Sequence, residues 1–249
     1  MLTSQAIQPT SNLRVAACLS GFPRNCINTF PYAKRHLFDT CSPDIFWAGF
    51  NEKKGVLDQE VIDLYQPKDY FFRDYDEDAI NEINKEFNNY QPTLVRQETK
   101  VERVKSQFYN VYLANELRKK YEKENGFNYD IVIRCRPDYY YFRDLTIGEL
   151  ELGIDGAIVI PDEWDWKLVS SYGVSDCFAY SSPETMDIYS KVFYHFAEYN
   201  SKCDLLFHQE TMLGYHLNKF GIKRIACERH FKFETPDGSH HERRDHNSG

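Results

Sequence analysis

Short apolar runs separated by amphipathic segments dominate the first third of the sequence. The runs at residues 13–19 (LRVAACL), 44–50 (DIFWAGF) and 70–73 are bounded by polar or turn-forming residues. Runs of this length are typical of buried strands. Between them, residues 28–40 and 58–65 carry apolar side chains at helical spacing. The resulting order, β-α-β-α-β, predicts a parallel sheet covered by helices.

The remainder of the chain continues this alternation. Residues 101–125 carry an apolar stripe at i, i+3 and i+4 spacing and predict a long helix that stops at Gly126. Residues 129–136 (YDIVIRCR) give the clearest buried strand. The remaining patterns predict strands at 157–161, 176–180 and 222–227, and helices at 182–200 and 208–220. We therefore predict an α/β fold class, with a mostly parallel sheet flanked by helices.

The length of 249 residues suits one large domain, which we place at residues 13–233. Residues 1–12 are polar and lack an apolar signal-peptide core, so we expect a flexible N-terminal tail. Residues 74–98 are rich in Asn, Asp and Glu and predict a surface insertion with a short helix at 79–87. Residues 234–249 are polar and predict a flexible C-terminal tail.

Composition and charge narrow the class of protein. The formal net charge of −8 provides no basic excess, so we expect no nucleic-acid partner. The mean hydropathy of −0.62 and the lack of an 18-residue apolar run predict no transmembrane segment. The seven cysteines are scattered, with no CxxC pair, which favours buried thiols in a reducing compartment. The absence of a membrane segment favours a cytoplasmic location, with peripheral membrane association as the alternative. The oligomeric state is left open.

The first candidate site follows the first strand, in the sequence SGFPRN. Ligands of open α/β sheets bind beyond the carboxyl ends of the strands. Ser20 and Gly21 form a small turn that a nucleotide can approach closely, and Arg24 can pair with a phosphate. The sequence matches neither the P-loop nor the GxGxxG pattern. An ordinary strand-to-helix turn is the alternative interpretation.

The second candidate is the end of the strand at 129–136, in the sequence RCRPD. Strand alternation points Arg134, Arg136 and Asp138 to one side. Two arginines at the end of an apolar strand are costly unless they meet anions, which are either phosphates or internal carboxylates. Asp138 is placed to hold a divalent metal ion that bridges a diphosphate.

The third candidate is a pair of carboxylates. Glu210 begins the last predicted helix, where it is either a general base for an acceptor hydroxyl or a partner of the helix dipole. Asp176 is a rival base or a ligand for sugar hydroxyls. Aromatic residues make up 16% of the chain, and Trp164 and Trp166 could stack on a sugar as well as pack in a core.

Several of these segments, in order, resemble a group of small bacterial and viral glycosyltransferase-like proteins. The resemblance spans about residues 13–230 and rests on segments LSGFPRN, SQFYNVYLANELRKKYEKENGF, YDIVIRCRPD, DCFAYSSPE and HQETMLGYHL. It implies a GT-A-like fold, which is a Rossmann-type α/β fold with a mixed, mostly parallel sheet that binds a nucleotide-sugar. It also implies a hexosyl- or pentosyltransferase active in glycan biosynthesis. The expected partners are a nucleoside diphosphate sugar as donor and a glycan as acceptor.

The resemblance also implies roles for the candidate residues. Ser20, Gly21 and Arg24 would lie at the nucleotide. Arg134, Arg136 and Asp138 would lie at the diphosphate and at a metal ion, Mn²⁺ or Mg²⁺, and Asp176 and Glu210 would face the donor sugar and the acceptor. This chain has arginine two positions before Asp138, where an aspartate of a DxD motif would stand, so the arginines are an alternative to the metal. Two rival functions are a sulfotransferase-like nucleotide-dependent transferase and a non-catalytic sugar-binding module.

Overall fold

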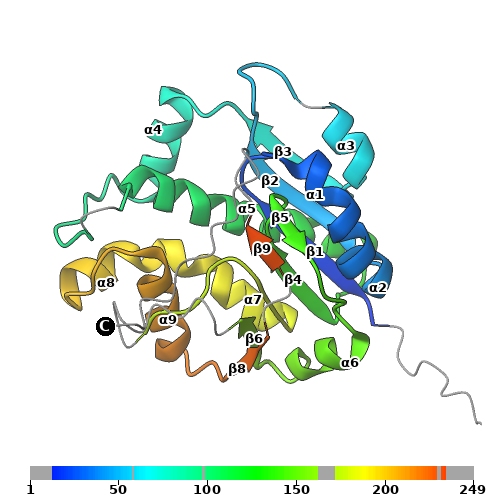
Figure 1. Ribbon diagram of the computed structural model, residues 1–249. Coiled ribbons are helices and arrows are strands. Elements are labelled where there is room, and N and C mark those ends of the chain that lie inside the picture. Colours follow the sequence, from blue (N-terminus) through cyan, green and yellow to red (C-terminus); the bar gives the residue numbers. More distant parts are fainter. Residues whose placement is uncertain (1–12, 58, 97–98, 162–171, 229–230, 234–249) are drawn as a thin grey trace, which may run out of the picture.

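The computed structural model describes residues 13–57, 59–96, 99–161, 172–228 and 231–233, and it is built around one seven-stranded sheet (Figure 1). In spatial order, its strands are β3 (Asp69–Arg73), β2 (Asp44–Phe50), β1 (Val15–Ser20), β4 (Ile131–Cys135), β7 (Ala179–Ser181), β6 (Ile158–Pro161) and β8 (Arg224–Cys227). Only β7 runs antiparallel to its neighbours. A separate two-stranded sheet pairs β5 (Tyr139–Tyr141) with β9 (Phe231–Phe233).

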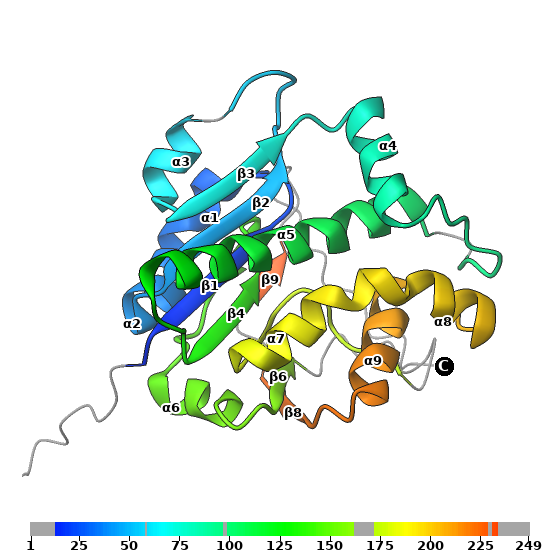
Figure 2. The same cartoon turned by 180° about the vertical axis from the view of Figure 1, so that it is seen from behind.

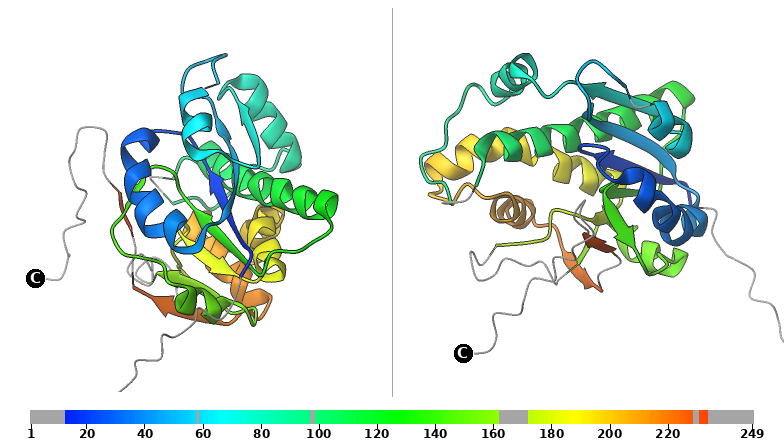
Figure 3. Two further views of the ribbon diagram at one scale, coloured as in Figure 1. Left: turned by 90° about the vertical axis from the view of Figure 1, so that its right-hand side faces the viewer. Right: turned by 45° about the horizontal axis from the view of Figure 1, so that its top comes forward.

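Helices cover both faces of the large sheet, as the opposite views of Figures 1 and 2 and the side views of Figure 3 show. One face carries α4 (Glu77–Glu86), α5 (Val101–Asn125), α7 (Pro183–Ser190), α8 (Phe196–Lys202) and α9 (Gln209–Lys219). The other carries α1 (Cys26–Ala33), a π-helical continuation at Lys34–Phe38, α2 (Asp39–Cys41), α3 (Gln59–Tyr65) and α6 (Ile147–Leu150). Each face has its own hydrophobic core because side chains of a strand alternate between the two sides of a sheet. The predicted fold class, a mixed and mostly parallel α/β sheet flanked by helices, is confirmed.

Most element boundaries agree with the apolar pattern, and the differences have local causes. The predicted strand at 176–180 begins only at Ala179, because residues before it form a loop. The predicted helix at 182–200 is divided by a 3-10 segment at Lys191–His195. Ser182 caps α7 through its side chain, and Pro183 is the first helical residue, as the sequence predicts. The pattern did not indicate β5, β9 or α6.

The polar segment at 74–98 contributes to the core as well as to the surface. Ala79, Ile83 and Phe87 are buried against the α5 side of the sheet. Lys105 of α5 is fully buried and donates to the side chain of Asn84 at 2.7 Å and to the carbonyl of Tyr90 at 2.8 Å. The segment is thus fixed to α5 by both apolar and polar contacts.

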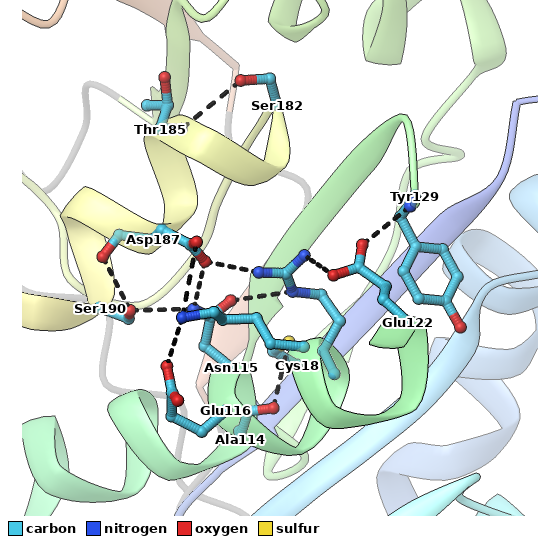
Figure 4. A network of polar contacts seen from close by, with 12 residues as sticks. Cys18, Ala114, Asn115, Glu116, Glu122, Tyr129, Ser182, Thr185, Asp187 and Ser190 are labelled. Carbon is cyan, nitrogen blue, oxygen red and sulfur yellow. Dashed lines mark hydrogen bonds and ion pairs between the residues drawn. The ribbon is translucent and has the colours of Figure 1, made fainter. Parts of the chain in front are cut away.

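A network of charged groups joins the C-terminal half of α5 to α7 (Figure 4). Arg118 is 1% exposed and donates to Glu122 at 2.7 Å, to Asp187 at 2.5 Å and to the Asn115 side-chain oxygen at 3.1 Å. The Asn115 amide nitrogen donates to Asp187 and to Ser190. Each polar atom of Asn115 therefore has a partner, which satisfies a group that is expensive to bury unpaired.

No helix in the part of the chain that the structure describes is long and apolar enough to cross a membrane. All seven cysteines are free, and five of them are buried. Burial raises the pKa of the Cys18 and Cys135 thiols to about 12, so both remain protonated at neutral pH.

The buried His216 of α9 makes the fold sensitive to acid. Its Nε2 donates to the Ile188 carbonyl at 2.8 Å, and its Nδ1 accepts from the Tyr199 hydroxyl at 2.7 Å, which is the neutral tautomer. Burial lowers the pKa of His216 from 6.5 to about 4. Between these two values the unfolded chain binds a proton that the folded chain does not, so stability decreases as the pH falls.

We expect His216 to account for about 3 kcal/mol of stability lost between pH 7 and pH 4. The measurement is urea unfolding at a series of pH values for the wild type and for His216→Gln, which cannot titrate. The variant should show a flatter pH dependence over this range. Parallel curves for the two proteins would show that His216 is not responsible.

Candidate functional site

The candidate site lies where the parallel strands β1 and β4 end. Their register pairs Cys18 with Arg134 and Leu19 with Cys135. The Ser20–Gly21 turn and the segment 136–138 therefore leave the sheet side by side at its carboxyl edge. This is the edge at which open α/β sheets bind ligands.

Two close backbone approaches fix the turn after β1. Gly21 has a φ of 112°, and its N–H donates to the Ala48 carbonyl at 3.1 Å. A Cβ at Gly49 of β2 would lie 2.1 Å from the Gly21 carbonyl oxygen, so only glycine allows this contact. A Cβ at Gly21 itself would meet no atom within 4 Å, which leaves open space at the turn.

Arg24 lies further along this loop, on the surface. Its guanidinium is 5.0 Å from the ring centroid of Phe22. Within the described part of the chain, no ion pair or hydrogen bond joins Arg24 to β4. The role of Arg24 as a phosphate ligand therefore stays a prediction.

Arg136 and Asp138 form a bidentate ion pair. The guanidinium donates from Nε to Asp138 Oδ1 at 2.9 Å and from Nη2 to Oδ2 at 2.7 Å. Asp138 is 3% exposed, whereas the Arg136 side chain is 24% exposed. The same guanidinium lies 4.8 Å from the Tyr139 ring centroid. Asp138 and Tyr139 thus hold Arg136 in one orientation, and three of its five N–H groups remain for other acceptors.

Arg134 is buried without an ion pair. It is 2% exposed, and its Nη1 donates to the Cys177 carbonyl at 3.3 Å. Its Nε has no hydrogen-bond partner, and no carboxylate lies within ion-pair distance, among the residues that the structure describes. A buried cation that is compensated only in part costs several kcal/mol. The charge of Arg134 is therefore compensated only in part by the residues around it, and an anionic group of a ligand would complete the compensation.

Asp176 lies beside Cys177, the residue that accepts from Arg134, and its carboxylate contacts link this segment to α5 and β5. Gln107 of α5 donates from Nε2 to one Asp176 carboxylate oxygen. The Cys177 thiol donates to the other at 3.3 Å, and the Tyr139 hydroxyl donates to the Cys177 sulfur at 2.8 Å. Burial raises the pKa of Cys177, so the thiol is a hydrogen-bond partner and not a nucleophile.

Glu210 approaches the same loop from α9. Its backbone carbonyl accepts from the Val174 N–H at 3.2 Å, two residues before Asp176. A Cβ at Gly214 would lie 1.5 Å from the Tyr172 carbonyl oxygen, so glycine is required for α9 to pack this closely. Glu210 Oε2 is 3.1 Å from His208 Nε2, which is in turn 3.1 Å from Arg96 Nη1. Glu210 is 6% exposed.

The site thus unites most of the residues that the sequence suggested. Contacts join Arg136 to Asp138, Arg134 to the Asp176–Cys177 segment, and Glu210 to the same segment through Val174. Ser20 and Gly21 lie at the same sheet edge. The sequence analysis missed Gln107 and Tyr139, and only their positions beside recognised motifs could have suggested them. Trp164 and Trp166 lie outside the described residues.

The carboxylates as placed do not form a recognisable metal centre. Both Asp138 oxygens already accept hydrogen bonds from a guanidinium, which would repel a neighbouring divalent cation. No group of three or more His, Cys, Asp or Glu side chains suited to a metal ion occurs within the described residues. The donor set around Asp138 therefore does not fit Mn²⁺ or Mg²⁺ in this arrangement, and we derive no step through a metal ion.

Two open hollows flank the sheet at opposite edges. One, of about 440 Å³, lies at the carboxyl ends of β2 and β3 and is lined in part by Asn51, Phe71 and Asp74. The other, of about 710 Å³, lies between the C-terminal half of α5 and the start of α7, beside Lys119 and Glu184. Only the first adjoins the edge that holds the candidate site.

Comparison with known proteins finds similarity among solved structures. No family model and no curated protein match the chain. Among solved structures, mouse xyloside xylosyltransferase 1 in its apo form is similar, with a TM-score of 0.47 and 11% sequence identity over 85% of this chain and 85% of that chain. The fold and the site by themselves define an α/β protein with a cluster of mostly buried arginines and carboxylates at the carboxyl edge of its sheet.

Proposed function

We propose that this protein is a glycosyltransferase that moves a sugar from a nucleoside diphosphate sugar to a hydroxyl group of a glycan acceptor. The observation that carries the proposal is the buried Arg134, which has no ion-pair partner among the described residues, beside the oriented Arg136 at the sheet edge where ligands bind. The segment resemblance supports the same reaction.

The two arginines match the main electrostatic task of such a reaction. When the bond between sugar and diphosphate breaks, negative charge develops on the departing diphosphate. Fixed guanidinium groups stabilise this charge without reorganising, and Arg136 is already oriented by Asp138. In this proposal, Asp138 acts by holding Arg136. Its alternative role as a metal ligand is tested below.

The heterocyclic base of the donor would occupy the 440 Å³ hollow. Asn51 donates from Nδ2 to Asp74 at 2.7 Å, while its buried Oδ1 has no partner within the described part of the chain. An unmet acceptor beside the Phe71 ring suits a planar ring that carries an N–H group.

The two carboxylates would divide the remaining work. Both Asp176 oxygens are held by donors from this chain, which suits a fixed ligand for donor hydroxyls. We assign the general base to Glu210, which would take the proton of the acceptor hydroxyl if the reaction inverts the anomeric centre.

The role of the Arg136–Asp138 ion pair is tested by removing both of its charges together. Arg136→Gln with Asp138→Asn leaves no uncompensated charge, and we expect the donor Kd to rise roughly 10- to 100-fold, because charge-assisted hydrogen bonds are lost. Isothermal titration with the donor measures this, with the exposed Arg35→Gln as control.

Asp138→Asn alone separates the two roles of Asp138. If Asp138 only holds Arg136, the variant changes the donor Kd by the same factor with and without Mn²⁺. Loss of a Mn²⁺-dependent part of the affinity would instead identify Asp138 as a metal ligand. An unchanged donor Kd in the double variant would count against a role for the Arg136–Asp138 ion pair and against the proposed site.

A further inference from the structure

Asn110 of α5 is buried with its hydrogen-bonding capacity unused. It is 1% exposed, and neither Nδ2 nor Oδ1 has a partner among the described residues. An amide buried without partners costs roughly 1–3 kcal/mol judged from mutational data on other proteins. By contrast, Asn115, one and a half turns further along the same helix, is fully paired (Figure 4).

Two contacts place Asn110 at the level of the turn after β1. Arg14, before β1, lies 4.6 Å from the Phe127 ring, after α5, and Cys18 donates to the Ala114 carbonyl. The helix therefore runs antiparallel to the strand. Asn110 lies about 6 Å from Ala114 toward the start of α5. A step of about 7 Å from Cys18 toward the end of β1 reaches Ser20.

Asn110 also shares its side of α5 with a residue of the candidate site. At 3.6 residues per turn, positions 107, 110 and 114 lie within about 60° of one another around the helix axis. Gln107 contacts Asp176, and Ala114 contacts β1. Asn110 thus lies between the Asp176 contact and the strand, beneath the edge that holds the Ser20–Gly21 turn.

The chemistry of the amide selects among possible ligands. A phosphate only accepts hydrogen bonds, so it could pair with Nδ2 but would leave Oδ1 unpaired. A hydroxyl group both donates and accepts, so two neighbouring hydroxyls can satisfy both ends of the amide. From the unpaired amide and its position, we infer that Asn110 binds a vicinal diol of the nucleotide-sugar donor. This inference rests on the function proposed above and deepens it.

Ligand binding requires one neighbouring side chain to turn aside, because both amide atoms are covered. Open space borders the turn at Gly21, where a Cβ would meet nothing within 4 Å. The unpaired amide then lowers the free energy of unfolding of the free protein, and ligand binding abolishes this loss by giving the amide partners. Residues retained against stability are characteristic of functional sites.

The test compares Asn110→Leu with Asn115→Leu, two replacements of similar size on one helix. Asn110→Leu should unfold at the wild-type temperature or above it, because it removes an unsatisfied amide. Asn115→Leu should unfold at a lower temperature, because it removes the hydrogen bonds that the Asn115 amide makes with Arg118, Asp187 and Ser190. For donors that bind the wild type, Asn110→Leu should raise the Kd about ten-fold or more, through the loss of two neutral hydrogen bonds.

The ligands are UDP, GDP, UDP-glucose and GDP-mannose, titrated separately. If the diol is that of the ribose, Asn110→Leu should raise the Kd of a nucleotide and of its sugar conjugate by the same factor. A diol on the transferred sugar predicts weakening for the conjugate alone. Wild-type affinity in Asn110→Leu for every ligand that binds would overturn the inference and leave the proposed function standing. No binding by the wild type would contradict the proposed function, and the inference with it.

Discussion

Glu210→Gln is expected to lower the rate of sugar transfer roughly 10²- to 10⁴-fold, the usual contribution of a general base. Glutamine keeps the size of the side chain but cannot take a proton. The contact between the Glu210 carbonyl and the Val174 N–H is made by the backbone, so it should survive the substitution. Donor affinity should therefore stay near that of the wild type, which separates a catalytic loss from a binding loss.

A matched control exists on another helix. Glu184 is the second residue of α7, just as Glu210 is the second residue of α9, but Glu184 is exposed. If Glu210 only complements the helix dipole, both substitutions to glutamine should have the same small effect, about 0.3–1 kcal/mol on stability and none on rate.

Asp176→Asn completes the comparison. Because Asp176 is held by Gln107 and Cys177, its substitution should weaken donor binding as well as turnover. A variant at Glu210 that transfers sugar at the wild-type rate would remove Glu210 from the mechanism. A full loss of rate at Asp176 alone, with donor affinity intact, would assign the base to Asp176. A reaction that retains the anomeric configuration requires no such base.

The second large effect concerns stability. Arg118→Ala is expected to lower the free energy of unfolding by about 3–5 kcal/mol, because it leaves the buried Glu122 carboxylate without its cation and removes one cation from the partly buried Asp187. Glu122 and Asp187 both lose a short contact to Arg118 (Figure 4). For a chain of this length, the loss corresponds to a fall in Tm of roughly 6–20 °C.

Lys119→Ala is the control for this effect. Lys119 is 33% exposed and pairs with Glu116 at 2.9 Å and with Asp187 at 3.8 Å. Pairs as exposed as these contribute about 1 kcal/mol or less. Thermal and urea unfolding of the two variants measure the difference. Equal, small effects would show that the buried network does not stabilise the junction of α5 and α7.

The strands of the large sheet could be predicted because each is a short apolar run with polar boundaries. The strand β4, for example, has the sequence IVIRC. Arg134 within it indicates a site because a buried charge needs a partner. The three-residue strand at Tyr139–Tyr141 could not be predicted in the same way. Its partner, Phe231–Phe233, lies about 90 residues later, and no periodicity in so short a segment specifies such a pairing.

The candidate site likewise has features that the local sequence predicts and features that depend on three-dimensional packing. Arg134, Arg136 and Asp138 could be recognised from local spacing, and their position at a strand end follows from the fold. The pairing of Arg136 with Asp138, however, depends on the conformation after Pro137, where strand alternation no longer applies. The contact between Gln107 and Asp176 joins residues 69 positions apart, and the unpaired amide of Asn110 emerges only from three-dimensional packing. Neither has a signature in the linear sequence.

The most direct test of the central claim is a thermal-shift series with UDP-, GDP- and CMP-sugars, each with and without Mn²⁺. A ligand that binds only the folded state at 100 times its Kd adds about 2.7 kcal/mol, which for this length raises the Tm by roughly 5–11 °C. We predict such a rise for one nucleotide class, with or without Mn²⁺, and its loss in the variant that combines Arg136→Gln with Asp138→Asn. The absence of a rise with every donor at millimolar concentration would contradict a nucleotide-sugar site and favour a sulfotransferase-like enzyme or a sugar-binding module.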